Sequence, residues 1–192
     1  MFTLKEIKDM VLALFDEFSI DNQIIAAADN GDYTIRIPML VNMLQLEWCR
    51  LVKISTSYTI THTKVEALYT MPSNFMEIEK IVKKDSYGYK EYNWKNRKTL
   101  KLLETDEGEY EVYYYKYPTK LTSNSLDTVE LDSCDEVSNL FPLKIASLLV
   151  KPEDTRGIAP MLLDMYDSEK RMLISRQIHE PQRTEVVYSI GG

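Results

Sequence analysis

The residues best suited to metal or acid–base chemistry are few and poorly spaced for either. His62 and His179 are the chain's two histidines. Neither has another residue at the spacing typical of a metal site or a catalytic triad. They are expected to be ordinary surface or half-buried histidines. Cys49 and Cys134 alone cannot form a disulfide framework or a zinc site, and they are predicted to be small buried thiols in a reducing compartment. We therefore expect no metal site, no catalytic histidine and no cofactor.

Two pairs of carboxylates could each share one strand face, a pattern that acid–base catalysis can use. These are Glu77 with Glu79 and Glu109 with Glu111. Both lie in strand-like runs near lysines, where solvated surface charge is the expected role. No HExxH, GxSxG, P-loop or CxxC motif occurs, and the six glycines build no phosphate-binding loop. The prediction is that the chain is not an enzyme, since an active site would have to be built from these carboxylates.

Size and charge narrow the class of protein further. A chain of 192 residues suits one domain, or one domain with an insertion. The net charge of −7 disfavours nucleic-acid binding as the main activity. The opening run has charges within its apolar residues, so no signal peptide is expected, and no stretch approaches the ~18 apolar residues of a membrane span. A cytoplasmic site of synthesis follows as the expectation.

The elements that must position any functional residue fall into three regions. Thr3 and Glu6 have capping-box spacing at the start of an amphipathic helix. The Asn30-Gly31-Asp32 stretch predicts a loop, and a second helix is expected from near Pro38 to about Ile54. Later helices are predicted from Pro142 through Val150 and from Pro160 to about Ile178. The methionines of the last helix fit a core or a helix–helix seam. One shared core is expected to contain Ile7, Val11, Phe15, Leu44, Trp48, Leu148 and Met165.

Between the helices, residues 55–121 are rich in Thr, Tyr, Val and Ile, in short runs separated by turn residues. The predicted strands are Ser57–Thr61, Val65–Tyr69, Ile78–Lys84, Tyr87–Tyr92, Thr99–Leu103 and Tyr110–Tyr117. Their spacing favours antiparallel hairpins. The predicted fold class is α+β, with a helical bundle (1–54 and 132–179), an inserted β region (55–131) and an extended C-terminal arm (180–192).

Charge is segregated along the inserted region. Residues 80–101 hold eight basic and two acidic residues, whereas residues 104–136 hold ten acidic and two basic ones. A solvated sheet could explain this pattern. A sharper hypothesis is a head-to-tail ring, in which Lys95, Arg97 and Lys98 of one subunit meet Glu109 and Glu111 of the next.

A tyrosine-rich run, YEVYYYKY, spans residues 110–117. Alternation would place Tyr113, Tyr115 and Tyr117 on one strand face, and Tyr110, Val112 and Tyr114 on the other. Base stacking is one interpretation of such a run, and packing at a core or interface is the other.

Several stretches of the chain also follow one another in a characteristic order. TLKEIKDMVLALFDE and RIPMLVNMLQLEWCRLV are two opening helices, the second with Ile37, Pro38 and Asn42. YTMPSNFMEIEKI, EYNWKNRKTLKL and GEYEVYYYKYPTKLT enter and build the β region, and LFPLKIASLLVKPEDTRGIAPMLLDMYDSEKRML closes the chain with helices. Over about residues 3–175, the order of these segments and their local sequences resemble the head-to-tail connector (adaptor) proteins of tailed bacteriophages.

The resemblance implies a structural virion protein, assembled in the cytoplasm of a bacterial host. It implies a dodecameric ring between the portal protein and downstream tail or stopper proteins. Such a ring helps to retain and conduct packaged DNA without sequence-specific binding, and a negative channel wall would repel the DNA backbone. The alternatives are another phage ring component, such as a stopper or tail-tube protein, and a small nucleic-acid-binding module that uses the basic hairpins.

The end of the chain is predicted to contact another protein. Pro181 is expected to stop the preceding helix, and residues 184–190 are rich in β-formers. Val186, Tyr188 and Ile190 would share one face, with Val187 on the other, so the segment could add a strand to a partner's sheet edge. The resemblance implies that this partner is the portal.

Overall fold

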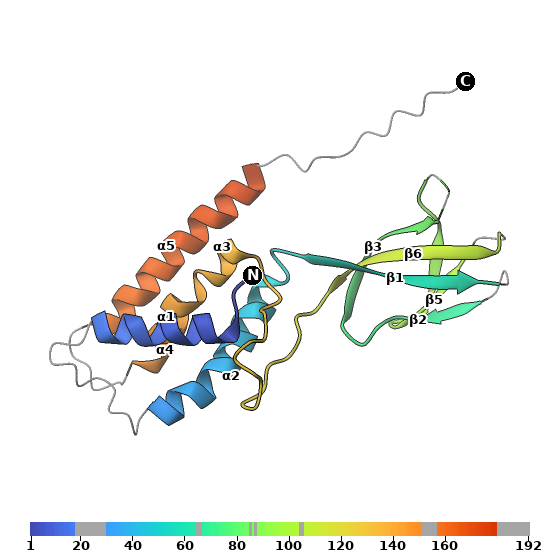
Figure 1. Ribbon diagram of the computed structural model, residues 1–192. Coiled ribbons are helices and arrows are strands. Elements are labelled where there is room, and N and C mark those ends of the chain that lie inside the picture. Colours follow the sequence, from blue (N-terminus) through green and yellow to red (C-terminus); the bar gives the residue numbers. More distant parts are fainter. Residues whose placement is uncertain are drawn as a thin grey trace.

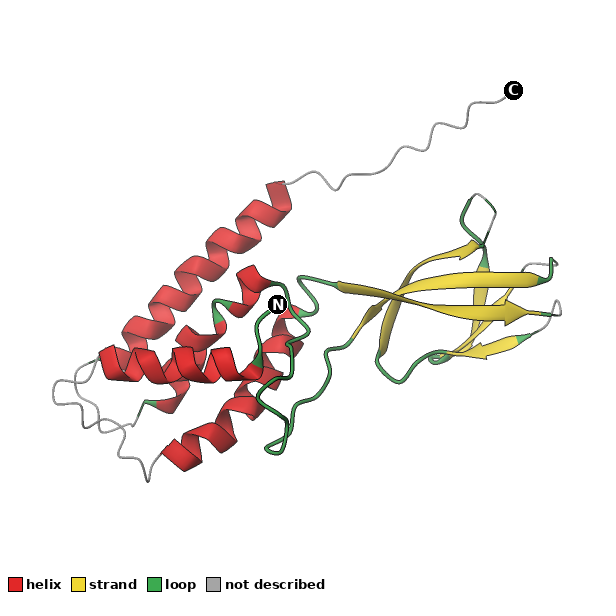
Figure 2. Cartoon of the chain, viewed as in Figure 1, coloured by secondary structure: helices red, strands yellow, loops and turns green. Residues whose placement is uncertain are grey.

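Helices and strands occupy separate parts of the molecule. The computed structural model describes residues 1–17, 30–63, 67–84, 86, 88–103, 106–150 and 157–179. The helices are α1 (Leu4–Glu17), α2 (Asn30–Trp48), α3 (Asp135–Ser138), α4 (Phe141–Leu149) and α5 (Ile158–His179). The strands are β1 (Ile54–His62), β2 (Leu68–Thr70), β3 (Phe75–Lys83), β4 (Tyr92–Asn96), β5 (Thr99–Leu102) and β6 (Gly108–Lys116). This arrangement confirms the predicted α+β class, with the strands between the helices of the two chain ends (Figures 1 and 2).

The first helix begins with the predicted capping box. The backbone N–H of Thr3 donates to the Glu6 carboxylate at 2.7 Å, and the N–H of Glu6 donates to the Thr3 hydroxyl oxygen at 3.3 Å. The hydrogen bond from the Thr3 backbone holds the pKa of Glu6 below its ordinary value. These reciprocal bonds satisfy two N–H groups that a helix start otherwise leaves unpaired.

The second helix differs from its prediction at both ends. It starts at Asn30, so the expected loop there is wrong, and Pro38 lies inside the helix instead of opening it. Tyr33 and Ile37 precede Pro38 in the helix, and both are buried on the same face as Val41, Leu44 and Trp48. Burial of this continuous apolar face outweighs the hydrogen bond that a proline removes. At the other end the chain leaves the helix after Trp48, and Ile54 already begins β1.

The helices share one core. Ile7, Val11, Leu44 and Trp48 are buried in it as predicted, and the described residues of this core also include Phe141, Ile145, Leu149, Ile158, Leu162, Tyr166 and Leu173. Two expectations are wrong: Leu148 and Met165 are 43% and 46% exposed. On α5 the buried face is made by Ile158, Leu162, Tyr166 and Leu173. The methionines therefore lie outside the core, and the side chain of Phe15 lies outside the described ones.

The strands form two antiparallel sheets, with orders β1-β6-β3 and β2-β5-β4. The register pairs Ile54 with Lys116 at one end of β1 and His62 with Gly108 at the other. The strand predicted at Tyr87–Tyr92 is wrong, because β4 starts at Tyr92 and pairs across the Arg97–Lys98 turn with β5. Leu100 and Leu102 of β5 are fully buried, and their burial favours this pairing. Tyrosine content alone was misleading evidence for a strand at 87–92.

The inner faces of the sheets build a second core. Tyr110, Val112 and Tyr114 are buried there, as the alternation predicts, so packing explains this face of the tyrosine run. His62 is also fully buried, which overturns the surface or half-buried expectation. Its Nδ1 atom lies 2.9 Å from the Tyr69 hydroxyl, and its ring lies edge-on to Tyr110. Cys49 is buried as expected, whereas Cys134 is exposed.

The chain returns from the sheets to the helices along residues 117–134. The Asn42 side chain on α2 holds this segment: its amide donates to the Leu121 carbonyl at 2.7 Å, and its oxygen accepts from the Leu121 N–H at 2.8 Å. Leu121 and Leu131 pack into the helical core. Among the described helices, none is long and apolar enough to cross a membrane.

Candidate contact groove at the β4–β5 hairpin

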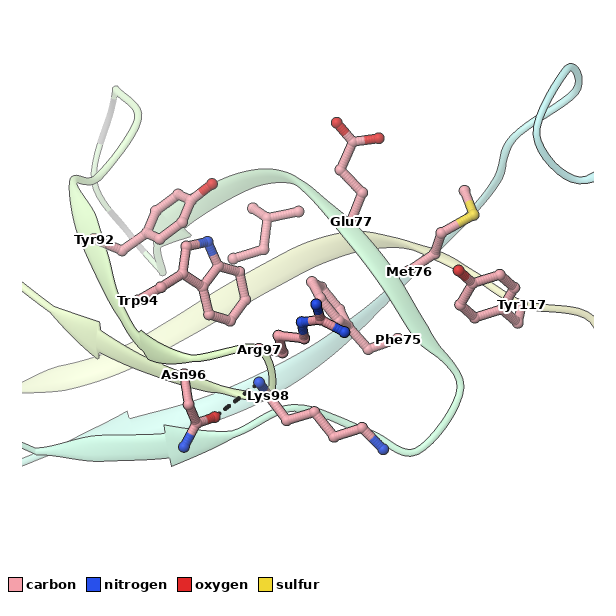
Figure 3. Close-up of a pocket in the computed structure, with 10 residues that line it drawn as sticks. Phe75, Met76, Glu77, Tyr92, Trp94, Asn96, Arg97, Lys98 and Tyr117 are labelled. Atoms are coloured by element: carbon pink, nitrogen blue, oxygen red, sulfur yellow. Dashed lines mark hydrogen bonds between the residues drawn. The ribbon is translucent and has the colours of Figure 1, made fainter.

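A groove of about 780 Å³ lies between the first half of β3 and the β4–β5 hairpin (Figure 3). This volume is within the ~300–1,000 Å³ of ordinary ligand sites. Its lining combines aromatic, aliphatic and charged side chains: Phe75, Met76, Glu77, Ile78, Tyr92, Trp94, Asn96, Arg97, Lys98 and Tyr117. The groove is therefore an amphipathic surface with a cationic rim at the hairpin turn.

Three aromatic rings give the groove its apolar floor. The Trp94 ring centroid lies 5.5 Å from that of Phe75 and 5.8 Å from that of Tyr92, with the Tyr92 ring nearly perpendicular. Phe75 in turn contacts the buried Tyr114, at 5.9 Å between centroids. Trp94 remains 42% exposed. A large indole is thus supported by the β core on one side and open to a partner on the other.

Bulges in β3 and in β4 shape the groove. The β4 register shifts between Trp94 and Asn96, which leaves Lys95 as the extra residue opposite β5. A bulge re-aims neighbouring side chains, so Trp94 and Asn96 both line the groove. Lys95 instead lines a smaller hollow on the other side of Trp94. The Asn96 carboxamide accepts a hydrogen bond of 2.9 Å from the Lys98 backbone N–H, which fixes the turn (Figure 3).

The cations at this hairpin differ from Lys53, Lys83 and Lys84 of the same β region. Lys53, Lys83 and Lys84 pair with Glu77, Asp106 and Glu109 at 2.6, 3.6 and 2.8 Å. In the part of the chain that the structure describes, Lys95, Arg97 and Lys98 form no ion pair, and all three are exposed. Glu77, on the groove wall, is already neutralised by Lys53. The groove therefore presents uncompensated positive charge beside exposed aromatic surface.

The acidic residues named by the sequence lie elsewhere on the sheet. Glu109 pairs with Lys84, and Glu111 accepts hydrogen bonds from Tyr113 at 2.8 Å and from Ser57 at 2.9 Å. The bonds from Tyr113 and Ser57 hold the pKa of Glu111 below its ordinary value. The two carboxylates thus have partners within their own subunit. The basic and acidic segments of the chain partly neutralise each other in cis.

The sequence interpretation identified the cations of this site but missed its aromatic residues. The sequence interpretation singles out neither Trp94 nor Tyr92, although the run YNWKNRK interleaves aromatic with basic residues, and it names Phe75 only for the family resemblance. The stacking hypothesis was applied to the run 110–117 instead, where Tyr110 and Tyr114 are buried. The predicted portal-contact residues Val186, Val187, Tyr188 and Ile190 lie outside the described residues, so that assignment stays a prediction.

Potential metal ligands do not gather within the described residues, where no group of three His, Cys, Asp or Glu side chains could hold an ion. The groove instead offers aromatic rings for stacking and cationic side chains for contacts with acidic groups.

A scan against protein-family models found no family that matches this chain, and a search of curated proteins found no match either.

Proposed function

We propose that this protein is a structural head-to-tail connector of a tailed bacteriophage, forming a ring between the portal and the tail and conducting packaged DNA. In this proposal the helices form a bundle that builds the body of the ring, and residues 180–192 form an extended arm that reaches the portal. The order of helices and strands in the sequence supports the family assignment. In this proposal the protein is assembled in the bacterial cytoplasm and lies in the neck of the virion.

One observation carries the proposal: the exposed aromatic surface of Trp94 lies beside Lys95, Arg97 and Lys98, which form no ion pair with any described residue. Exposed aromatic and arginine side chains at the centre of a patch are typical of protein–protein contact surfaces. Lys95, Arg97 and Lys98 are three of the five residues that the sequence predicts at the subunit contact. A ring subunit needs such a surface, and an unpaired cationic rim gives it a preference for acidic partners.

Reconstitution with portal-bearing heads tests the connector role. The full chain should bind heads that display their portal and add a ring visible by negative-stain microscopy. Truncation after Glu180 should leave the thermal unfolding midpoint unchanged but abolish attachment. If the full chain fails to join portal-bearing heads, the connector role is wrong. If the truncated chain attaches normally, the portal-contact assignment of the arm is wrong.

The same groove favours a second candidate, a single-stranded nucleic-acid-binding module. Exposed aromatics among lysines and arginines stack bases and neutralise phosphates. An oligonucleotide should then quench Trp94 fluorescence, and its affinity should fall steeply with salt. Trp94→Phe would separate this signal from that of Trp48. An oligonucleotide that leaves the Trp94 emission unchanged at low salt would eliminate this candidate.

A further inference from the structure

The outer face of α5 is an apolar stripe that the helical core leaves uncovered. Met161, Met165 and Met172 are all exposed, and their spacing of four and seven residues places them on one face of the helix. Ser168 completes the same stripe. Such i, i+4, i+7, i+11 anchors are how a helix docks in an apolar groove. Methionine is suited to that role because its flexible thioether packs well against aromatic rings.

Acidic side chains accompany this stripe. At 100° per residue, Asp164 and Glu169 lie on its two sides. Both are exposed and, among the residues that the structure describes, neither forms an ion pair. The next lysine, Lys170, is bound instead to Glu47 of α2. The exposed Arg171 lies on the same side as Asp164, and its guanidinium donates a hydrogen bond of 3.1 Å to the Asp167 carbonyl oxygen. Between Met161 and Met172 the outer face of α5 is therefore apolar at its centre, and its edges carry the acids Asp164 and Glu169 against one arginine.

We propose that the β4–β5 groove of one subunit binds the Met161–Met172 face of α5 on a second copy of this chain. The two surfaces are complementary: the groove is aromatic in its floor with Arg97 and Lys98 at its rim, and the helix face carries methionines with acids at its sides. Met161 and Met165 would lie against Trp94 and Phe75, and Asp164 and Glu169 would face the cations. This inference rests on the proposed ring and replaces Glu109 and Glu111 as the acidic partners.

The positions of the two surfaces determine the kind of assembly. The hairpin and α5 lie in different parts of the molecule, so the surfaces cannot meet within one chain (Figure 1). Two different patches in contact form a heterologous, head-to-tail interface, which generates a ring when its rotation closes. Each subunit would then use its groove toward one neighbour and its α5 face toward the other.

A second exposed stripe, on α2, is a poorer counterpart for the groove. It consists of Ile35, Met39, Met43 and Leu46. Among the described side chains, the basic Arg36 lies along it, and the nearby Glu47 is bound to Lys170. Within those described side chains, the α2 stripe shows no uncompensated acid of the kind that the cationic rim requires. It therefore serves as the internal comparison for the α5 assignment.

Two charge-reversed variants of the full chain test the contact. The groove variant carries Arg97→Glu and Lys98→Glu, and the helix variant carries Asp164→Arg and Glu169→Arg. Across a concentration series in sedimentation velocity, the unaltered chain should self-associate and each variant should remain monomeric with an unchanged circular dichroism spectrum. A one-to-one mixture of the two variants should again form the larger assembly, because the acidic helix face of the groove variant meets the basic groove of the helix variant, and the reversed groove of the first meets the reversed helix face of the second. All four substitutions in one chain should restore growth of the assembly.

Trp94→Ala should weaken the association about thirtyfold or more, as expected for an aromatic at the centre of an interface. Met39→Gln on α2, and the pair Glu109→Lys with Glu111→Lys, should have no effect. Benzoylphenylalanine at position 94 should cross-link to the peptide that contains Met161–Met172. An unaltered chain that stays monomeric and gives no α5 cross-link overturns the contact, as does loss of association in the α2 or Glu109/Glu111 controls.

The outcomes also separate this contact from the connector role. A ring on portal-bearing heads that tolerates both charge-reversed variants keeps the connector and overturns the α5–groove contact. Head-to-tail association of the purified chain without attachment to portal-bearing heads keeps the contact and overturns the connector.

Discussion

The indole nitrogen of Trp48 donates a hydrogen bond to the hydroxyl oxygen of Tyr166, with 3.1 Å between the two atoms. Both side chains are almost completely buried. The Tyr166 hydroxyl donates in turn to Glu47 at 3.4 Å, and Lys170 binds the same carboxylate. Burial is the main cause that raises the pKa of Tyr166 to about 12, so the hydroxyl keeps its proton at physiological pH. This chain of contacts ties the end of α2 to the middle of α5.

Removing either member of this pair should destabilise the helical part, by different amounts. Trp48→Ala empties a large buried volume and should lower the free energy of unfolding by ~3–5 kcal/mol. Tyr166→Phe keeps the volume but leaves the indole N–H buried without an acceptor, at a cost of ~1–3 kcal/mol. Met165→Ala, next to Tyr166 but exposed, should stay within ~0.5 kcal/mol. Denaturant titration measures all three, and a Trp48→Ala loss below ~1 kcal/mol would contradict this account.

Asp132 should make stability depend on acidic pH. Burial raises the pKa of this carboxyl, but hydrogen bonds from Lys116 and from the Thr119 backbone, each of 2.7 Å, outweigh it and hold the pKa below its ordinary value. The stabilisation is therefore complete above the unfolded pKa of about 3.9 and is lost as the pH falls through the lower folded pKa. Asp132→Asn should cost ~1–3 kcal/mol at pH 7 and progressively less as the pH drops below 4.

The Lys84–Glu109 pair provides the control for this measurement. Its side chains are 63% and 51% exposed, against 22% and 20% for Lys116 and Asp132. An exposed ion pair contributes only about 0–1 kcal/mol, so Glu109→Gln should have little effect. Equal losses for the two variants at pH 7, or a constant Asp132→Asn loss down to pH 3, would show that the Asp132 contacts contribute no special stability.

The inserted strands should be removable without unfolding the helices. Ile54 and Lys116 face each other in the sheet, so their Cα atoms lie only about 5 Å apart. The described helical core contains no residue from 55–115. Replacing residues 55–115 by a short Gly/Ser linker should leave a protein with helical circular dichroism and one cooperative thermal transition. A remainder that shows no cooperative transition would mean that the sheets support the helical core.

Local patterns in the sequence predict much of this fold, and their failures have physical reasons. The Thr3–Glu6 capping box and the alternation of residues 110–117 depend on nearest neighbours, and both are confirmed. The start of α2 and the exposure of Met165 depend on which face the other helices cover, which no local pattern specifies. For the candidate groove, the charge pattern indicated Lys95, Arg97 and Lys98. The place of Trp94 in the groove depends on the β4 bulge and on how β4 lies against β3. Both features arise only in the folded sheets, so no local pattern indicates them.

The way in which β1 and β6 join the helices has a mechanical consequence. The two strands leave the helical part side by side, so a pull on the far end of the β region loads two covalent backbones in parallel (Figure 1). Their shared hydrogen bonds need not break for the strands to bear this tension. The load would instead reach the junctions at residues 49–53 and 117–121, where the two hydrogen bonds of Asn42 grip Leu121. The first junction is held by hydrogen bonds from Leu51 and Val52 to the Trp48 carbonyl oxygen. Strain between the two parts of the molecule would thus fall on these bonds and on the Asn42–Leu121 pair.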